Sequence, residues 1–184
     1  MQKDLFMSVE AQGETYQLRQ ARPQHLLDIL SLLVDASNWL QTKDTTQWDY
    51  YRTDLEGNTG EVVESMENGN TFVLEKESEV IATLTLEPEP GEFDFDLWGD
   101  AAKDEGAIYL HRLVVLREHA GKGIGAALLR WAEAYAKKSG KTKLRFDCVA
   151  NNEGLNAYYQ QFYPLKKKVE AYGGHCIYEV LLEE

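Results

Sequence analysis

The sequence is short of cysteine and proline, and each shortage excludes a class of protein. Its 184 residues include two cysteines and four prolines. Cys148 and Cys176 lie in strand-like segments without CxxC spacing, so we expect buried, reduced thiols rather than a disulfide scaffold. Low-complexity and Pro/Gly/Ser-rich tracts, which mark linkers and disordered regions, are also missing. These shortages indicate a folded globular chain.

Long apolar stretches are missing as well. Nowhere do eighteen apolar residues run together, and the opening MQKDLFMSVEAQGE has neither the basic nor the apolar region of a secretory signal. We therefore expect no membrane partner, no secretion and a cytoplasmic location. The length suits one folded domain over residues 1–184.

Positive charge is scarce in the first part of the chain. Residues 1–106 hold seven Lys/Arg against 23 Asp/Glu, whereas residues 107–184 hold twelve against eight, and the net charge is -12. An acidic half favours a cationic ligand and a basic half a polyanionic one, although solvated surface charge explains the imbalance equally well. A chain this acidic is not expected to bind nucleic acid.

The hydrophobic pattern of the first half changes its period several times. Residues 15–21 alternate like a strand, and helical spacing follows Pro23. Residues 40–60 are irregular or weakly helical, and a short helix follows. Residues 71–77 and 79–88 predict an antiparallel hairpin. Residues 88–106 are acidic and rich in turn formers, so we expect a long surface excursion, with an apolar face formed by Phe93, Phe95, Leu97 and Trp98.

The second half has the clearest elements. Residues 107–116 are near-continuously apolar and β-branched, which predicts a central strand buried on both faces. Residues 124–140 place Ile124, Leu128 and Ala132 on one helical face. The remaining pattern predicts a strand at 143–150, a helix at 151–164 and two final strands joined at Gly173 and Gly174. The fold class is therefore α/β (α+β), with a mixed sheet flanked by helices.

A glycine-spaced loop separates the best strand from the best helix. Gly121, Gly123 and Gly125 let backbone N–H groups face an anion, and a helix N-terminus favours phosphate. A tight turn with close helix packing would need the same glycines. A P-loop would need a Ser or Thr hydroxyl after Lys122, and Gly123 follows instead. A dinucleotide-binding fingerprint would need an acidic residue about 20 residues further on, and Asp147 lies at a suitable distance. That fingerprint also requires preceding strands that alternate with helices, which the pattern does not show.

Beyond these glycines, a longer pattern is specific. The segment LHRLVVLREHAGKGIGAALLRWAEAYAKKSG, followed by LRFDCVANNEGLNAYYQQF, resembles the central motif of GNAT acetyltransferases and the strand and helix after it, over about residues 107–165. The resemblance implies a GNAT-type acyl-CoA N-acyltransferase fold with a mostly antiparallel central sheet. It also implies N-acetyltransferase activity with acetyl-CoA as co-substrate and no metal, and a homodimer is a plausible assembly in such a family.

The resemblance also assigns roles to particular residues. Backbone groups of one strand would pair with the pantetheine arm, loop and helix amides would hold the diphosphate, and two side chains of the next helix would complete the site. Two departures from the family pattern are Ala120, where Arg or Gln is usual, and Tyr163-Pro164, where Gly-Phe is usual. The implied cofactor residues are Leu113, Val114, Val115, Ala120, Gly121, Lys122, Gly123, Ile124, Gly125, Ala126, Asn152 and Tyr159.

Acetyl transfer to an amine requires a base for the amine proton and an acid for the departing thiolate. A tyrosine hydroxyl stays protonated at neutral pH, and we assign the acid role to Tyr159 rather than Tyr158, with core packing as the alternative. His111 is either a base or a packed residue. His25, His119 and His175 lack metal-ligand spacing, so no metal is expected.

The acceptor is less defined than the cofactor. The sequence points to a small-molecule or peptide amine, and the acidic residues 87–104 favour a cationic one such as a polyamine, an aminoglycoside or a lysine side chain, or they form a solvated loop. Trp39, Trp48, Trp98, Tyr50 and Tyr51 either wall its pocket or pack in the core. A non-catalytic acyl-CoA-binding protein, transfer to a protein N-terminus and a longer acyl donor remain as alternatives.

Overall fold

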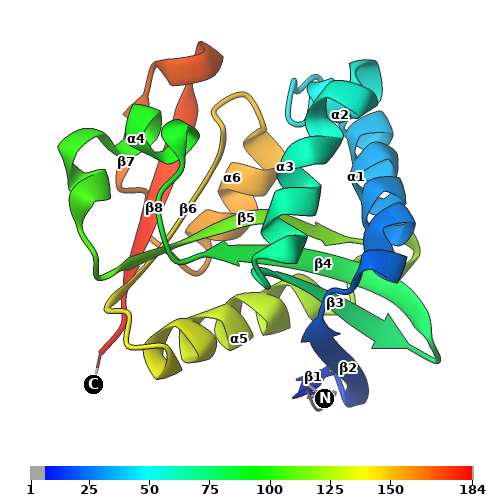
Figure 1. Cartoon of the computed structure of the whole chain (residues 1–184). Coiled ribbons are helices and arrows are strands. Elements are labelled where there is room, and N and C mark those ends of the chain that lie inside the picture. The colour runs from blue at the N-terminus through cyan, green and yellow to red at the C-terminus, as the bar shows by residue number, and fades with distance from the viewer. Residues whose placement is uncertain (1–6, 184) are drawn as a thin grey trace. The chain divides into compact units, whose positions relative to one another are not determined.

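Eight strands follow one another in a single sheet in the order β1-β2-β3-β4-β5-β6-β8-β7 (Figure 1). The pairing of β5 with β6 is parallel, whereas β1–β2, β2–β3, β3–β4, β6–β8 and β7–β8 are antiparallel. The sheet is therefore mixed and mostly antiparallel, as predicted. The strands are β1 Met7–Ala11, β2 Glu14–Gln20, β3 Thr71–Lys76, β4 Glu79–Glu87, β5 Ala107–Val115, β6 Lys143–Val149, β7 Lys167–Val169 and β8 His175–Leu181.

The structure is a computed structural model that describes residues 7–183, in two units. The first unit contains the chain up to Asn38, Trp48–Thr85 and Arg112–Trp131, and the second contains the remainder. The division into two units does not test the prediction of a single domain over residues 1–184, which remains a prediction. Residues 1–6, which carry part of the argument against a secretory signal, lie outside the described residues.

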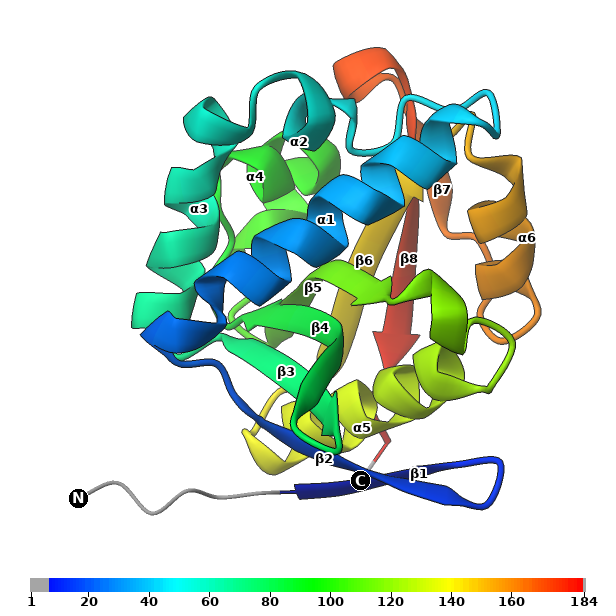
Figure 2. The same cartoon turned by 90° about the vertical axis from the view of Figure 1, so that its right-hand side faces the viewer.

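Helices cover the strands of the first unit on the face that Val73 and Val80 share. Ile29 and Leu33 of α1 (Leu26–Gln41) and Val62 of α3 (Leu55–Glu67) belong to the same buried cluster as these valines. The short helix α2 (Asp49–Thr53) precedes α3. Figure 2 shows α1 running along this layer and β1–β2 as a hairpin at its edge. Apolar residues at helical spacing in α1 explain this burial.

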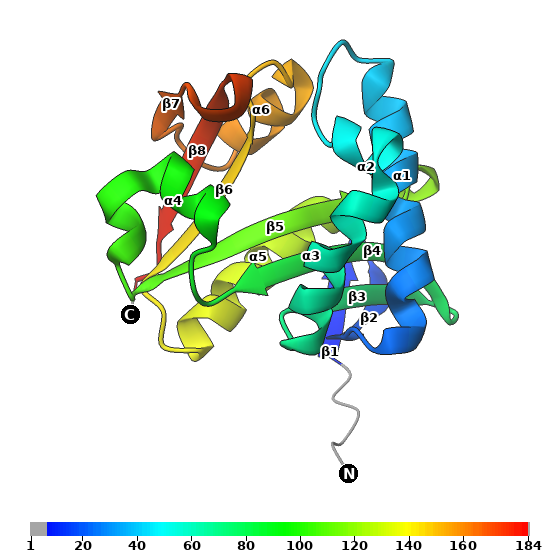
Figure 3. The same cartoon turned by 45° about the horizontal axis from the view of Figure 1, so that its top comes forward.

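In the second unit, helices lie on both faces of the strands. On one face, Leu97 and Trp98 of α4 (Glu92–Trp98) pack with Tyr109 and Ile177. On the other, α6 (Glu153–Gln160) places Tyr159 against Phe146 of β6. Figure 3 shows α4 and α6 beside β6 and β8.

The observed elements correct the sequence prediction in three places. Strand β1 was not predicted. Residues 88–106 are not a surface excursion, because Leu97 and Trp98 are buried in α4 and Ala102 is buried in the 3-10 helix Gly99–Lys103. The helix predicted to reach Pro164 ends at Gln160. By contrast, α5 (Ile124–Lys138) agrees with its pattern, and β5 is a central strand that is buried on both faces over residues 107–110 and partly exposed over 111–113. The two cysteines are free and buried, as predicted.

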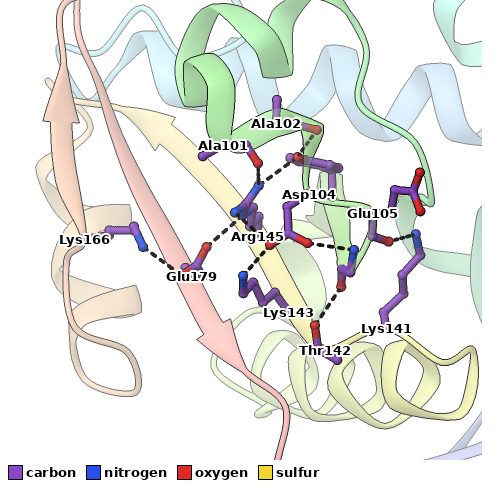
Figure 4. A network of polar contacts seen from close by, with 12 residues as sticks. Ala101, Ala102, Asp104, Glu105, Lys141, Thr142, Lys143, Arg145, Lys166 and Glu179 are labelled. Atoms are coloured by element: carbon purple, nitrogen blue, oxygen red, sulfur yellow. Dashed lines mark hydrogen bonds and ion pairs between the residues drawn. The ribbon is translucent and has the colours of Figure 1, made fainter.

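One buried arginine ties α4 and its neighbours to the sheet of the second unit (Figure 4). Arg145 is 3% exposed and stacks 4.4 Å from the Trp98 ring centroid. Its guanidinium donates to Glu179 at 2.9 Å, to the Ala101 carbonyl at 2.8 Å and to the Tyr109 hydroxyl at 3.0 Å. Removing one partner of such a buried ion pair leaves the other charge without compensation, which destabilises the fold.

Arg145→Met should therefore lower the free energy of unfolding by about 3–5 kcal/mol, because Glu179 loses its buried partner. Lys166→Met is the matched control, since Lys166 contacts the same carboxylate at 2.7 Å from an exposed position. Its loss should cost at most about 1 kcal/mol. Urea titrations of the three proteins measure both values, and equal losses would contradict this ranking.

Candidate active site

A strained residue interrupts β5 just before Leu113–Val115. Arg112 has φ 51, a left-handed conformation that costs a non-glycine residue about 1–3 kcal/mol. Its guanidinium donates to the Ser65 hydroxyl at 2.7 Å and lies 4.0 Å from Glu61, which accepts a hydrogen bond from Tyr51 at 2.6 Å. Such strain is frequent at ligand sites. Within the predicted pantetheine segment, Val114 is buried and Leu113 and Val115 are partly exposed.

The glycine loop ends where α5 begins, at Ile124, as the helical pattern predicted. Gly121 and Gly123 have φ 77 and φ 74, values that glycine adopts without strain. A Cβ at Gly121 would meet no atom within 4 Å, so the loop leaves open space there. Gly125 and Ala126 fall in the first turn of α5, where backbone N–H groups have no helical acceptor and the helix dipole is positive. The arrangement suits an anion.

Two other loop residues lie beside these amides. Ala120 is exposed and extended, with φ -62 and ψ 147, and its methyl group offers no hydrogen bond. The Lys122 ammonium donates to Nδ1 of His119 at 3.3 Å. The loop therefore carries one cation, but position 120 supplies no donor side chain.

Asn152 caps the N-terminus of α6 in the second unit. Its Oδ1 accepts a hydrogen bond from the Leu155 amide at 3.2 Å. The side chain is 5% exposed, and its Nδ2 is buried without a hydrogen-bond partner among the described residues. A buried unsatisfied donor costs about 1–3 kcal/mol, and few occur in native proteins. Among the described residues this amide therefore has no acceptor, and it is available to donate to a ligand or a water molecule.

Tyr159 lies in the last turn of the same helix. Its ring is 4.8 Å from Phe146 and 5.5 Å from Tyr178, and the residue is 5% exposed. Burial raises the pKa of Tyr159 well above its usual range, so the hydroxyl stays protonated. Within residues 7–183 this hydroxyl makes no hydrogen bond. Tyr159 thus combines core packing with a donor that is not committed to the fold, and Tyr158 is more exposed.

Four titratable side chains gather on the α4 side of the second unit. Nε2 of His111 lies 3.1 Å from Oδ1 and 3.3 Å from Oδ2 of Asp94, which is 3% exposed. Oδ1 still lacks a well-aligned hydrogen bond. Asp147 and His175 belong to β6 and β8, and Nδ1 of His175 donates to the Ala171 carbonyl at 3.0 Å. Two carboxyls and two imidazoles therefore share one region of a single unit.

Their charges act on one another. Burial raises the pKa of Asp147 to about 6, with a further increase from Asp94 and a partial decrease from His111 and His175. Asp147 therefore changes charge near the pH at which an imidazole also titrates. Perturbed, mutually coupled groups of this kind are typical of sites that move protons.

Sequence reasoning named His111 but missed Asp94, Asp147 and the gathering itself. The available signal was a polar residue at a position where an apolar strand continues on both sides, as in LHRLVV and RFDCV. Spacing in the sequence does not reveal the contact, because α4 lies far along the chain from β6 and β8. Among the described residues, no group of His, Cys, Asp and Glu has the arrangement of a metal site.

The five aromatic candidates for the acceptor pocket do not share one environment. Trp98 and Tyr51 are buried core residues, at 7% and 1% exposed. Tyr50 is exposed, and Trp39 and Trp48 are partly buried. The core alternative is confirmed for Trp98 and Tyr51, and a pocket role for the others remains a prediction.

Three comparisons place this chain among known proteins. Residues 32–162 match the model of the acetyltransferase (GNAT) family. The uncharacterized N-acetyltransferase YesJ of Bacillus subtilis is 41% identical over 135 residues, which is 72% of each chain. A GNAT family acetyltransferase from Listeria monocytogenes has a TM-score of 0.80 at 28% identity, covering 96% of this chain and 100% of its own.

A more distant relative adds information on the fold. The PaiA N-acetyltransferase of Thermoplasma acidophilum, solved in complex with coenzyme A, has a TM-score of 0.67 at 18% identity and covers 91% of this chain and 99% of its own. Together with the mixed sheet, these similarities confirm the predicted fold class.

Proposed function

Because the chain belongs to the acetyltransferase (GNAT) family, as residues 107–165 indicated, we propose that it transfers an acetyl group from acetyl-CoA directly to a primary amine. The family makes the chain an N-acetyltransferase. The direct mechanism, the residues that carry it and the amine are our proposal. The observation that carries the proposal is the buried, unsatisfied Nδ2 of Asn152 on the helix that also bears Tyr159.

Coenzyme A fits the groups that the chain offers. Its diphosphate requires N–H donors and a positive field, which Gly121, Gly123 and the first turn of α5 supply. Its pantetheine arm carries amides that Leu113–Val115 would bind through their backbone. Asn152 Nδ2 needs an acceptor, and a pantetheine carbonyl is one. When bound, acetyl-CoA supplies an activated acetyl group as a thioester.

Tyr159 acts at the leaving group. Its hydroxyl donates a hydrogen bond to the sulfur on which negative charge develops when the C–S bond breaks. Because burial keeps the pKa of Tyr159 well above that of a thiol, the hydroxyl still carries its proton when charge develops on the sulfur, as the acid role requires. A donor aimed at developing charge stabilises the transition state more than the ground state.

The proton of the amine goes to the cluster formed by His111, Asp94, Asp147 and His175. A primary amine is only about one part in a thousand neutral at pH 7, so a base must accept its proton. Asp94 holds the His111 imidazole through Nε2 and stabilises its charged form. We assign the base role to His111 and positioning roles to Asp94 and Asp147.

The amine itself is proposed only as a class. Asp147 adds negative charge to the cluster above about pH 6, which favours a cationic small molecule or a peptide amine. The cytoplasmic location, the homodimer and the lack of a nucleic-acid or metal partner remain predictions. None of the helices formed by residues 7–183 has the length and apolar character needed to cross a bilayer.

Thermal unfolding with and without acetyl-CoA tests the proposal, with ADP and NAD as controls. Ligand at a hundredfold over its Kd should add about 2.7 kcal/mol, which raises Tm by several degrees in a chain of this size. Thiol release is then measured against a polyamine, an aminoglycoside and a lysine peptide. No shift with millimolar acetyl-CoA would contradict the cofactor assignment, and a shift without thiol release from any amine would favour a non-catalytic binding protein.

A further inference from the structure

The turn between β1 and β2 contains a residue that does not suit it. Ala11 pairs with Glu14, so Gln12 and Gly13 form a two-residue hairpin loop, with φ 49 and φ 82. Both values are positive, as in a type I′ turn, where Asn or Gly is preferred at the first position. Glutamine is less suited to the left-handed conformation than asparagine, which is its shorter analogue. The turn geometry therefore does not explain the glutamine at this position.

That side chain lies across the glycine loop of the same unit. Nε2 of Gln12 donates to the Gly121 carbonyl at 3.4 Å. A Cβ placed on Gly123 would lie 3.4 Å from the same Nε2 and 3.5 Å from Cγ of Gln12. In Figure 2 the β1–β2 turn and the loop before α5 lie on the same side of the unit. Gln12 thus donates to one left-handed glycine of the predicted diphosphate site and borders the space where a side chain at the other would lie.

The contact leaves donor capacity. A side-chain amide carries two N–H donors, and the bond to Gly121 is long and uses one of them. Gln12 is exposed, so its amide is able to shift toward a ligand. Ala120, the neighbour of Gly121, contributes no donor of its own.

The surrounding charge favours an anion at this place. Glu14, at the end of the turn, is neutralised by Lys76, which with a smaller contribution from Lys122 holds the pKa of Glu14 below its usual range. The field of Lys122 therefore reaches the hairpin. With Glu14 paired to Lys76, Lys122 is the cation that the glycine loop itself supplies beside its amides.

We propose that Gln12 is a coenzyme A ligand whose side-chain amide donates to the diphosphate at residues 120–123, in place of the side chain that Ala120 lacks. The proposal rests on the proposed use of acetyl-CoA. It assigns the β1–β2 hairpin, which lies outside the family motif, to the cofactor site.

Gln12→Asn is the decisive variant, because Asn suits the left-handed turn better but is one methylene shorter. We expect its Kd for acetyl-CoA, measured by calorimetry, to rise about tenfold, the effect of one charge-assisted hydrogen bond. Binding of S-acetylpantetheine, which has no diphosphate, should be unchanged. Gln17→Asn, on an exposed position of β2, is the matched control and should bind both ligands like the wild type.

A rescue variant tests the position of the missing donor. Adding Ala120→Gln to Gln12→Asn should restore the Kd for acetyl-CoA to within about threefold of the wild type. If Gln12→Asn binds acetyl-CoA like Gln17→Asn, or loses both ligands equally, Gln12 is not a diphosphate ligand. If the wild type itself does not bind acetyl-CoA, the proposed function fails, which is a separate outcome.

Discussion

Tyr159→Phe should lower kcat for acetyl transfer by about 10²–10³-fold and leave the Kd of acetyl-CoA unchanged. Phenylalanine keeps the ring contacts with Phe146 and Tyr178, and no hydrogen bond of the fold is lost, because the hydroxyl makes none within residues 7–183. The change therefore removes only the proposed donor to the departing sulfur. Steady-state kinetics at saturating amine, together with calorimetric titration of acetyl-CoA, measure the two quantities separately.

Tyr158→Phe is the matched control on the same helix. Tyr158 is more exposed and its ring lies 6.0 Å from that of Tyr159, so its change should alter kcat less than threefold. An acetyl thioester with a more acidic thiol provides a second check. A better leaving group needs less help from an acid, so Tyr159→Phe should lower kcat less with this donor. If Tyr159→Phe keeps full kcat, or if it loses cofactor affinity instead, Tyr159 is a packing or binding residue rather than the acid.

The sequence predicted the parts of the fold in which local pattern and tertiary position agree. In α5, apolar residues recur at helical spacing, and Ile124, Leu128 and Ala132 are buried as expected. In β5, a β-branched apolar run marks a central strand. In both elements the local pattern and the tertiary position favour the same structure, so the pattern alone is enough to predict the element.

Prediction failed where a segment is stabilised by partners distant in the chain. Residues 92–98 are acidic, yet they form a helix, because Leu97 and Trp98 pack on Tyr109 and Ile177 and Arg145 covers the Trp98 ring. The cluster around His111 was hidden for the same reason. Its members come from α4, β5, β6 and β8, and only the folded sheet brings them together.

His111→Gln should lower kcat/KM by about 10²–10³-fold at pH 7, because the amine loses the group that accepts its proton. Asp94→Asn should have a smaller effect, since it leaves the imidazole in place but weakens its charged form. Both proteins should bind acetyl-CoA like the wild type. A loss confined to cofactor Kd would contradict the base assignment, and unchanged kcat/KM in His111→Gln would exclude it.

The pH profile adds a readout that a structural role would not change. Since the pKa of Asp147 is raised to about 6, wild-type kcat/KM should rise with pH through about 6, because the charged Asp147 stabilises the imidazolium that forms when His111 accepts the amine proton. Asp147→Asn should remove this limb. His111 and His175 lower the pKa of Asp147, so His111→Gln should move the titration of Asp147 to higher pH.

Stability should respond to Asp147 in the opposite sense from activity. The folded-state pKa is above the unfolded value of about 3.9, so the folded state binds more protons between about pH 4 and pH 6, and stability falls as the pH rises through that window. Asp147→Asn, which resembles the protonated form, should therefore unfold at higher urea than the wild type at pH 8 and at similar urea at pH 4. A variant that is more stable yet slower would show that the Asp147 carboxylate is retained for its role in proton transfer rather than for the fold.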